Sequence, residues 1–160
     1  MAEQDGSGAG RPPGGYTFDD LRVGQRFESG THRLDEGEIR AFAAAFDPQP
    51  FHLDDAAARD TLFGGLAASG WHTAAVTMKL MVGGAPFLGG MIGAGGEIAW
   101  PRPTRPGDVL QVFSEVLELA PSRSSPERGS VTLRSETRNQ RGDVLQVLTA
   151  RLIVPRRPAA

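Results

Sequence analysis

One helix-length segment is apolar on nearly every side, and it constrains the fold more than any other feature of the chain. Residues 70–82 (GWHTAAVTMKLMV) carry a single charge, on Lys79. A helix whose whole circumference is apolar belongs in the interior of a protein. The rest of the chain is therefore expected to supply a layer that wraps around this helix.

The segments after this helix have the patterns of strands. Candidate strands span 97–102, 108–119, 130–139 and 144–154, and apolar and polar residues alternate clearly in the last two. The polar stretch 139–142 (NQRG) between these two predicts a hairpin turn. Together with a strand over 25–34, this order predicts an α+β hotdog fold, in which an antiparallel sheet wraps around a central buried helix.

The N-terminal part contains a further helix and a tail. Asp35 and Glu38 form the pattern of a helix cap, and apolar residues follow at helical spacing up to Phe46. A second short helical turn capped by Asp54 is expected before Arg59. The expected domain organisation is a disordered glycine- and proline-rich tail over 1–15, one domain over 16–155 and a C-terminal tail over 156–160.

Composition excludes several classes of function. The net charge is −2 and the pI is about 5.9, so no electrostatic feature favours nucleic acid. The chain has no cysteine, which removes disulfides and thiolate chemistry and is compatible with a reducing compartment. No apolar run is long enough to cross a membrane and no signal sequence is visible, so we expect a cytoplasmic protein. The three histidines lack companion carboxylates at ligand spacing, so no metal site is expected.

A proline-bent segment carries an acid and an imidazole five positions apart. Asp47 and His52 flank Pro48 and Pro50, and each proline fixes its own φ and moves the preceding residue out of the helical region. The linker therefore cannot continue the preceding helix. Such preorganisation suits two titratable groups that act on one small reactant. A helix-ending loop with both side chains in water is the alternative interpretation of these residues.

The region around these two residues resembles the MaoC-like dehydratase and (R)-specific enoyl-CoA hydratase family. The family motif runs Asp-x-Asn-Pro-x-His-x-Asp, followed by Phe-x-x-Pro/Gly-Ile-x-His/Ser-Gly. The residues that match it are Asp47, Pro50, His52, Asp54, Phe63 and Gly70. The stretch 105–108 (RPGD), at the start of a predicted strand, fits as well. The resemblance covers about residues 16–155, and Gln49 stands where the family usually has Asn.

The resemblance implies a hydro-lyase that interconverts a 2-enoyl-CoA and an (R)-3-hydroxyacyl-CoA. Asp47 and His52 would activate water and return a proton to the substrate. A carboxylate and an imidazole can both exchange protons near neutral pH once burial and neighbouring charges tune them. Water is then the co-substrate, the substrate is an acyl-CoA or acyl-carrier thioester, and no metal or redox cofactor is implied.

Four residues are expected to bind the substrate. In the family, the glycine that matches Gly70 donates its backbone N–H to the thioester carbonyl, and a helix N-terminus favours such an oxyanion. Glycine at this position also lets the substrate approach closely. Gln49, Ser69 and Trp71 complete the expected group, although the longer amide of Gln49 departs from the family pattern.

Two other functions compete with this one. A thioesterase on the same fold would use a carboxylate to direct water at the carbonyl carbon. A non-catalytic subunit would bind acyl thioesters without turnover, and the Gln49 departure keeps this alternative open. The resemblance also implies a homodimer, because a lone five-stranded sheet leaves an open edge that proteins usually cover.

Three further regions carry secondary expectations. His72 is expected to be a core or wall residue rather than a ligand. The segment 83–96 has seven glycines and is expected to be a pliable connection, either a flap over an acyl pocket lined by residues such as Phe87 or a structural loop. Arg102 and Arg105 either meet coenzyme A phosphates or are simply solvated.

Overall fold

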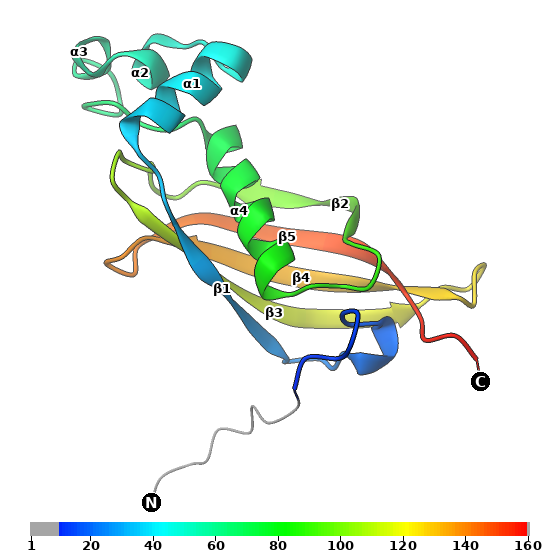
Figure 1. The fold of residues 1–160 in the computed structure, drawn as a ribbon. Helices are drawn as coiled ribbons and strands as arrows, with labels where there is room; N and C mark the ends of the chain where they lie inside the picture. Colours follow the sequence, from blue (N-terminus) through cyan, green and yellow to red (C-terminus); the bar gives the residue numbers. More distant parts are fainter. Residues whose placement is uncertain (1–9, 160) are drawn as a thin grey trace, which may run out of the picture.

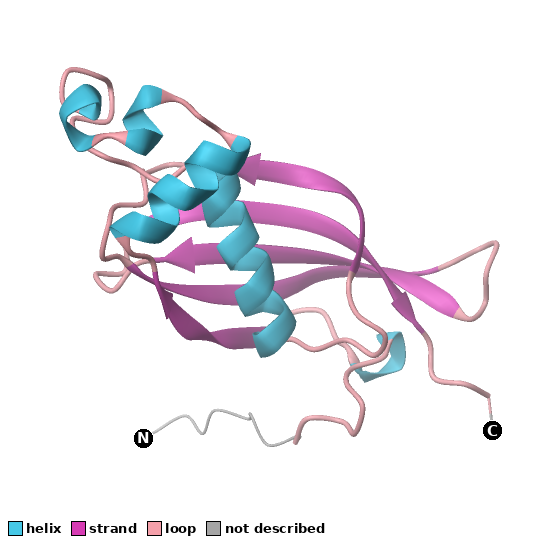
Figure 2. Cartoon of the chain, turned by 45° about the horizontal axis from the view of Figure 1, so that its top comes forward, coloured by secondary structure: helices cyan, strands magenta, loops and turns pink. Residues whose placement is uncertain are grey.

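The helix α4, Gly70–Gly84, lies across one face of a five-stranded antiparallel sheet (Figures 1 and 2). The computed structural model describes residues 10–159. The strands are β1 (Arg26–Arg33), β2 (Ile92–Ala99), β3 (Val109–Pro121), β4 (Arg128–Arg138) and β5 (Val144–Pro155). Their order in the sheet is β1-β3-β4-β5-β2. This is the α+β hotdog arrangement that the sequence predicts.

The helices α1 (Glu36–Phe46), α2 (Pro50–Leu53) and α3 (Asp55–Ala58) gather at one end of the sheet, away from both ends of the described chain (Figure 1). A short 3-10 helix spans Phe18–Asp20. The predicted cap of α1 is confirmed: the Asp35 carboxylate accepts from the Glu38 backbone N–H at 2.8 Å, and the Glu38 side chain accepts from the Asp35 N–H at 3.1 Å. The cap fixes where α1 begins, and α1 ends before Asp47 because Pro48 moves the residue before it out of the helical region.

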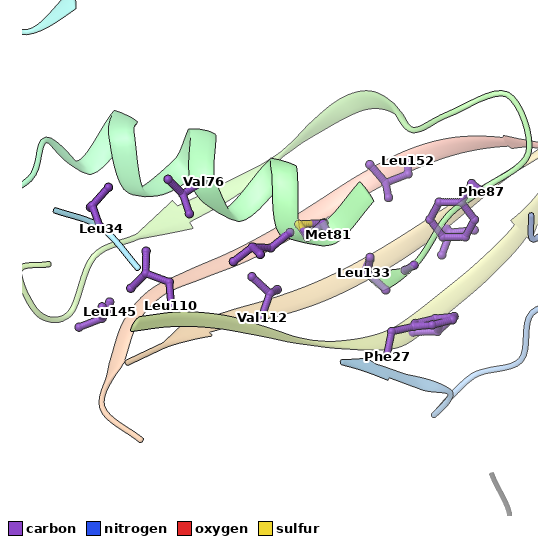
Figure 3. Close-up of a cluster of buried hydrophobic side chains, with 14 of the residues drawn as sticks. Phe27, Leu34, Val76, Met81, Phe87, Leu110, Val112, Leu133, Leu145 and Leu152 are labelled. Carbon is purple, nitrogen blue, oxygen red and sulfur yellow. The ribbon is translucent and has the colours of Figure 1, made fainter. Parts of the chain in front are cut away.

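The core lies between α4 and the concave face of the sheet (Figure 3). Alternate residues of β4 point into it, so that Val131 and Leu133 are fully buried while their neighbours are partly exposed. Val112 of β3 and Met81 of α4 pack in the same cluster. The regular alternation of these strands is what allowed the sequence to predict them.

The glycine-rich segment differs from the prediction. The strand β2 already begins at Ile92, so part of the expected flap is regular sheet. Gly96 is needed in this strand because a Cβ there would lie 2.4 Å from the carbonyl oxygen of Thr149 on β5. Phe87 is a buried core residue and does not line an open acyl pocket. The glycine content suggested a flexible segment. At Gly96, however, glycine is required because β2 lies close to β5.

The helix α4 is covered on one side only in the single chain. Trp71, Met78 and Val82 are 61%, 42% and 48% exposed, and their spacing places them along one stripe of the helix. The expectation of a helix buried on all sides is therefore wrong for one copy, because the sheet reaches only part of its circumference. The uncovered stripe is apolar, which is unusual for solvent-facing helix surface.

The ends of the described chain run close to the sheet. The expected disordered tail falls mainly on residues 1–9, outside the described residues, whereas Gly15 donates to the Pro12 carbonyl at 3.0 Å and Tyr16 to the Pro86 carbonyl at 2.8 Å. Near the C-terminus, Arg156 pairs with Asp19 at 2.8 Å. Within residues 10–159, no helix has the length and apolar character needed to span a membrane.

Candidate active site

The end of α1 and the short helix α2 bring Asp47 and His52 together. Asp47 caps the C-terminus of α1, where its N–H bonds to the Ala43 carbonyl at 2.9 Å. Pro50 occupies the start of α2, so His52 lies on a new helical turn that follows the break after α1. The distance from Nε2 of His52 to Oδ2 of Asp47 is 3.4 Å. The two groups can therefore reach one small molecule.

Two side chains hold the Asp47 carboxylate in place. Ser69 donates its hydroxyl to Oδ2 at 2.6 Å, and the Gln49 amide donates to Oδ1 at 2.6 Å. Burial acts to raise the pKa of Asp47, but these two hydrogen bonds and the charge of His52 outweigh it and hold the pKa below its usual value. Asp47 is therefore ionised at neutral pH and available as a base.

The hydrogen bonds show which groups Ser69 and Gln49 contact within the chain. Ser69 is fully buried, and its Oγ both donates to Asp47 and accepts from the Trp71 N–H at 3.3 Å. It therefore orients the acid and caps α4. The Gln49 amide nitrogen is likewise directed at the acid. Its extra methylene, compared with the family's Asn, does not prevent a contact with the carboxylate.

His52 is held by a backbone carbonyl that determines which ring nitrogen carries hydrogen. Its side chain is buried, and Nδ1 lies 2.7 Å from the carbonyl oxygen of Ala67. A carbonyl oxygen only accepts hydrogen bonds, so Nδ1 carries a hydrogen in either charge state of the ring. In the neutral ring Nε2 is then left with its lone pair, on the side of Asp47, and is the nitrogen that can take or give a proton.

Gly70 begins α4 beside this pair and offers a backbone donor. Its N–H has no acceptor among the residues that the structure describes. A Cβ at this position would lie 2.7 Å from Cε2 of Trp100, so packing of the indole is by itself a reason for glycine here. Trp100 is fixed by a 2.9 Å hydrogen bond from its Nε1 to the buried Gln146 side chain. Trp71 packs edge-on against Trp100, with ring centroids 5.2 Å apart.

Other predicted residues lie outside this arrangement. His72 is buried and stacks on Phe42 at 4.5 Å, as expected of a wall residue, and burial lowers its pKa. Arg102 pairs with Asp143 at 2.8 Å. Arg105 is directed inward at backbone carbonyls, which conflicts with a role in binding coenzyme A phosphates. No group of three potential metal-binding side chains occurs in residues 10–159.

The residues that sequence reasoning missed are Trp100, Gln146 and the inward role of Arg105. The only available signal for Arg105 was its position in the RPGD stretch before β3. That pattern does not reveal which distant carbonyls the guanidinium meets. Packing decides this contact.

Known proteins share both the sequence pattern and the fold of this chain. The family model described as "MaoC like domain" matches residues 20–139. The chain is 35% identical over 127 residues to the uncharacterized protein YdeM of Bacillus subtilis, covering 78% of this chain and 88% of that protein.

Two solved structures extend the comparison. The MaoC-like dehydratase from Rhodospirillum rubrum has 58% identity and a TM-score of 0.89, and the match covers 91% of this chain and all (100%) of that one. The R-hydratase PhaJ1 from Pseudomonas aeruginosa has 29% identity and a TM-score of 0.71, with 89% and 88% of the two chains covered. With an acid, an imidazole and a free helix-terminal amide in one place on this fold, the chain belongs to the MaoC-like dehydratase family.

Proposed function

We propose that the protein is a hydratase/dehydratase that adds water reversibly to a 2-enoyl thioester and forms the (R)-3-hydroxyacyl thioester. The observation that carries this proposal is the 3.4 Å approach of His52 Nε2 to Asp47 Oδ2 beside the free N–H of Gly70. Membership of the MaoC-like dehydratase family and similarity to a protein named as an R-hydratase support it.

In the proposed reaction, water binds between the carboxylate of Asp47 and Nε2 of His52. Asp47 and His52 together take a proton from the water molecule while the water oxygen bonds to the β-carbon of the substrate. The electron pair of the carbon–carbon double bond shifts toward the thioester oxygen, where the Gly70 N–H stabilises the developing negative charge. The pair then returns one proton to the α-carbon. It ends in its original state, so the step needs no metal or redox cofactor.

The lengthened distance between the two groups fits this role. A direct N–H···O hydrogen bond is usually about 2.7–3.2 Å long, and the observed 3.4 Å lies beyond that range. Neither atom is therefore fully engaged with the other. Each keeps a lone pair for a third molecule, as two groups that share a water require.

Replacing each member of the pair tests the proposal. The variants Asp47→Asn and His52→Gln should lower kcat for hydration of crotonyl-CoA by about 10²-fold or more, because each removes one half of the acid–base pair. Asn is isosteric with Asp and Gln keeps a polar side chain in place of His, so circular dichroism should show that both variants remain folded. Full hydration activity in both variants would refute the assignment.

The same substrate separates the competing functions. Loss of the enoyl absorbance without release of free thiol supports hydration, and chiral analysis of the product reports the (R) configuration. Release of free thiol would indicate a thioesterase. Binding without turnover across a panel of coenzyme A and acyl-carrier thioesters would indicate a non-catalytic subunit.

We further propose that the protein works as a homodimer. The apolar stripe of α4, formed by Trp71, Met78 and Val82, is exposed, and β2, one of the two edge strands of the sheet, has nearly all its residues exposed. An open strand edge and an apolar helix surface suit a second copy of the chain, which would cover both.

Light scattering tests the dimer. The wild-type protein should have twice the mass of one chain, and Val82→Glu, which places a charge in the stripe, should shift the mass toward that of one chain. A monomeric wild type would remove the proposal. Lys79→Gln is the control, because it also changes the charge of α4 by one unit, at an exposed position outside the stripe.

A further inference from the structure

We propose that Arg105 is a positioning residue of the site, which holds the segment 63–66 so that the following Ala67 carbonyl fixes His52. This inference rests on the proposed function, because it concerns how the same imidazole is kept in its working state. Arg105 lies in the connection between β2 and β3, about 40 residues away in sequence from the carbonyls that it meets.

The guanidinium binds three carbonyl oxygens of one short segment. Nη1 donates to Gly65 at 3.0 Å and to Leu66 at 3.3 Å, and Nη2 donates to Phe63. In the part of the chain that the structure describes, Arg105 forms no ion pair with a carboxylate. The planar N–H donors of its guanidinium therefore bind these backbone carbonyls. A lysine ammonium could not reproduce this arrangement of hydrogen bonds.

Neighbouring contacts hold the other sides of the same segment. The Asp55 carboxylate accepts from the Leu66 N–H at 3.0 Å, and the Ala68 N–H donates to the Thr104 carbonyl at 2.9 Å. Thr104 and Arg105 are adjacent, so one stretch of the β2–β3 connection binds the backbone on both sides of Ala67. The backbone of Arg105 is itself anchored, since its N–H donates to the buried Asp108 at 2.8 Å.

This arrangement acts on the site through Ala67. The Ala67 N–H donates to the Phe51 carbonyl at 3.2 Å, and the Ala67 carbonyl oxygen accepts a hydrogen bond from Nδ1 of His52 at 2.7 Å. If the carbonyl moves, the ring loses the contact that keeps hydrogen on Nδ1 and the lone pair on Nε2. Small displacements of a reacting group of this kind can cost about 10²-fold in rate.

The segment needs an external support because it has little regular structure of its own. It contains Gly64 and Gly65, both with positive φ, at 63° and 156°. Backbone of this kind is permissive in conformation, and ordering it costs more entropy than ordering other residues. The three carbonyl contacts of Arg105 compensate for this freedom at the point where the chain approaches the imidazole.

Kinetics of Arg105→Ala and Arg105→Lys test the proposal, with Arg102→Ala as the control in the same connection. We expect both Arg105 variants to lose about 10²-fold in kcat for crotonyl-CoA hydration with little change in KM, and the control to match the wild type. Wild-type kcat in Arg105→Lys would show that charge alone suffices and would overturn the role of the planar fork. A lowered unfolding temperature with unchanged kcat would show a merely structural role.

A spectroscopic readout separates this inference from the proposed function. Nitrogen-15 NMR of the imidazoles, with the His52 signals identified from the His52→Gln variant, should show hydrogen on Nδ1 in the wild type and exchange between both nitrogens in the Arg105 variants. If the wild type hydrates no thioester, the proposed function fails while this measurement still decides the role of Arg105. An unchanged His52 signal in both Arg105 variants would refute it.

Discussion

The segment that carries the site and the sheet that carries the fold are held by different contacts. Residues 47–70 are held by side-chain hydrogen bonds that span long distances in the sequence. Ser69 binds Asp47, and Arg105, which lies outside this segment, binds the carbonyl of Gly65. In β3, β4 and β5, backbone pairing and buried aliphatic residues dominate. Directional contacts fix geometry, whereas burial of apolar surface provides most of the stability.

This difference predicts that stability and catalysis respond to different substitutions. A change in the sheet should reduce the free energy of unfolding without changing the chemistry of the molecules that remain folded. A change in the site segment should alter proton transfer at a smaller cost in stability. The stack of His72 on Phe42 joins α4 to α1, the two helices that flank the site segment.

The largest effect on stability is expected at the centre of the sheet. Leu133→Ala removes a fully buried side chain and should lower the free energy of unfolding by about 2–5 kcal/mol, measured by urea denaturation. The value of kcat per folded molecule should stay unchanged. Leu62→Ala, at a fully exposed position, is the control and should stay within about 0.5 kcal/mol of the wild type. A large loss of kcat in Leu133→Ala would break the separation of the two regions.

A smaller effect, with its own pH dependence, is expected from Ser69→Ala. This change removes a hydrogen bond that helps to hold the pKa of Asp47 below its usual value, so the pKa should rise and the acid limb of kcat/KM should move to higher pH. Stability should fall by about 1–3 kcal/mol. A depressed carboxyl pKa contributes stability above the unfolded value, about 3.9, and that contribution is lost as pH falls through the folded pKa.

The stability of Ser69→Ala should also depend on pH. The stability difference between Ser69→Ala and the wild type should therefore shrink as the pH falls below the unfolded pKa, about 3.9, and through the lower folded pKa of Asp47. An acid limb that does not move would show that Asp47 is not the group that controls it. The Ser69→Thr variant keeps the hydroxyl and is the control for loss of the hydrogen bond alone.

The smallest effect is expected at His72. Burial is the main cause that lowers its pKa, the charge of Glu38 acts to raise it, and the like charge of His32 adds to the lowering. Below the unfolded pKa, about 6.5, His72 binds a proton more readily in the unfolded chain than in the folded chain. The free energy of unfolding should therefore decrease as the pH is lowered, by at most about 1.4 kcal/mol per pH unit. His72→Phe keeps the stack on Phe42 and should flatten this dependence between pH 7.5 and 5, roughly the range in which histidine titrates. An unaltered slope in His72→Phe would contradict this origin.

Much of the fold could be predicted from the sequence because its signals are local. The cap formed by Asp35 and Glu38 and the turn over 139–142 each lie within a few residues. The alternation in β3, β4 and β5 reports which side of each strand faces the core. Asp47 and His52 are five positions apart across a proline bend, which left a solvated loop as an alternative, and the family resemblance was what favoured their acting together.

Only the tertiary structure decided the environment of that pair. The sequence determined one acid, one imidazole and a helix N-terminus near one another, because short chain segments restrict where such groups can lie. Ser69 as the partner of Asp47, Trp100 against Gly70 and Arg105 on the segment 63–66 all depend on how distant segments pack. The exposed apolar stripe of α4 could not be predicted for the same reason. The sequence shows which residues of the helix are apolar, but not which neighbouring element covers each of them.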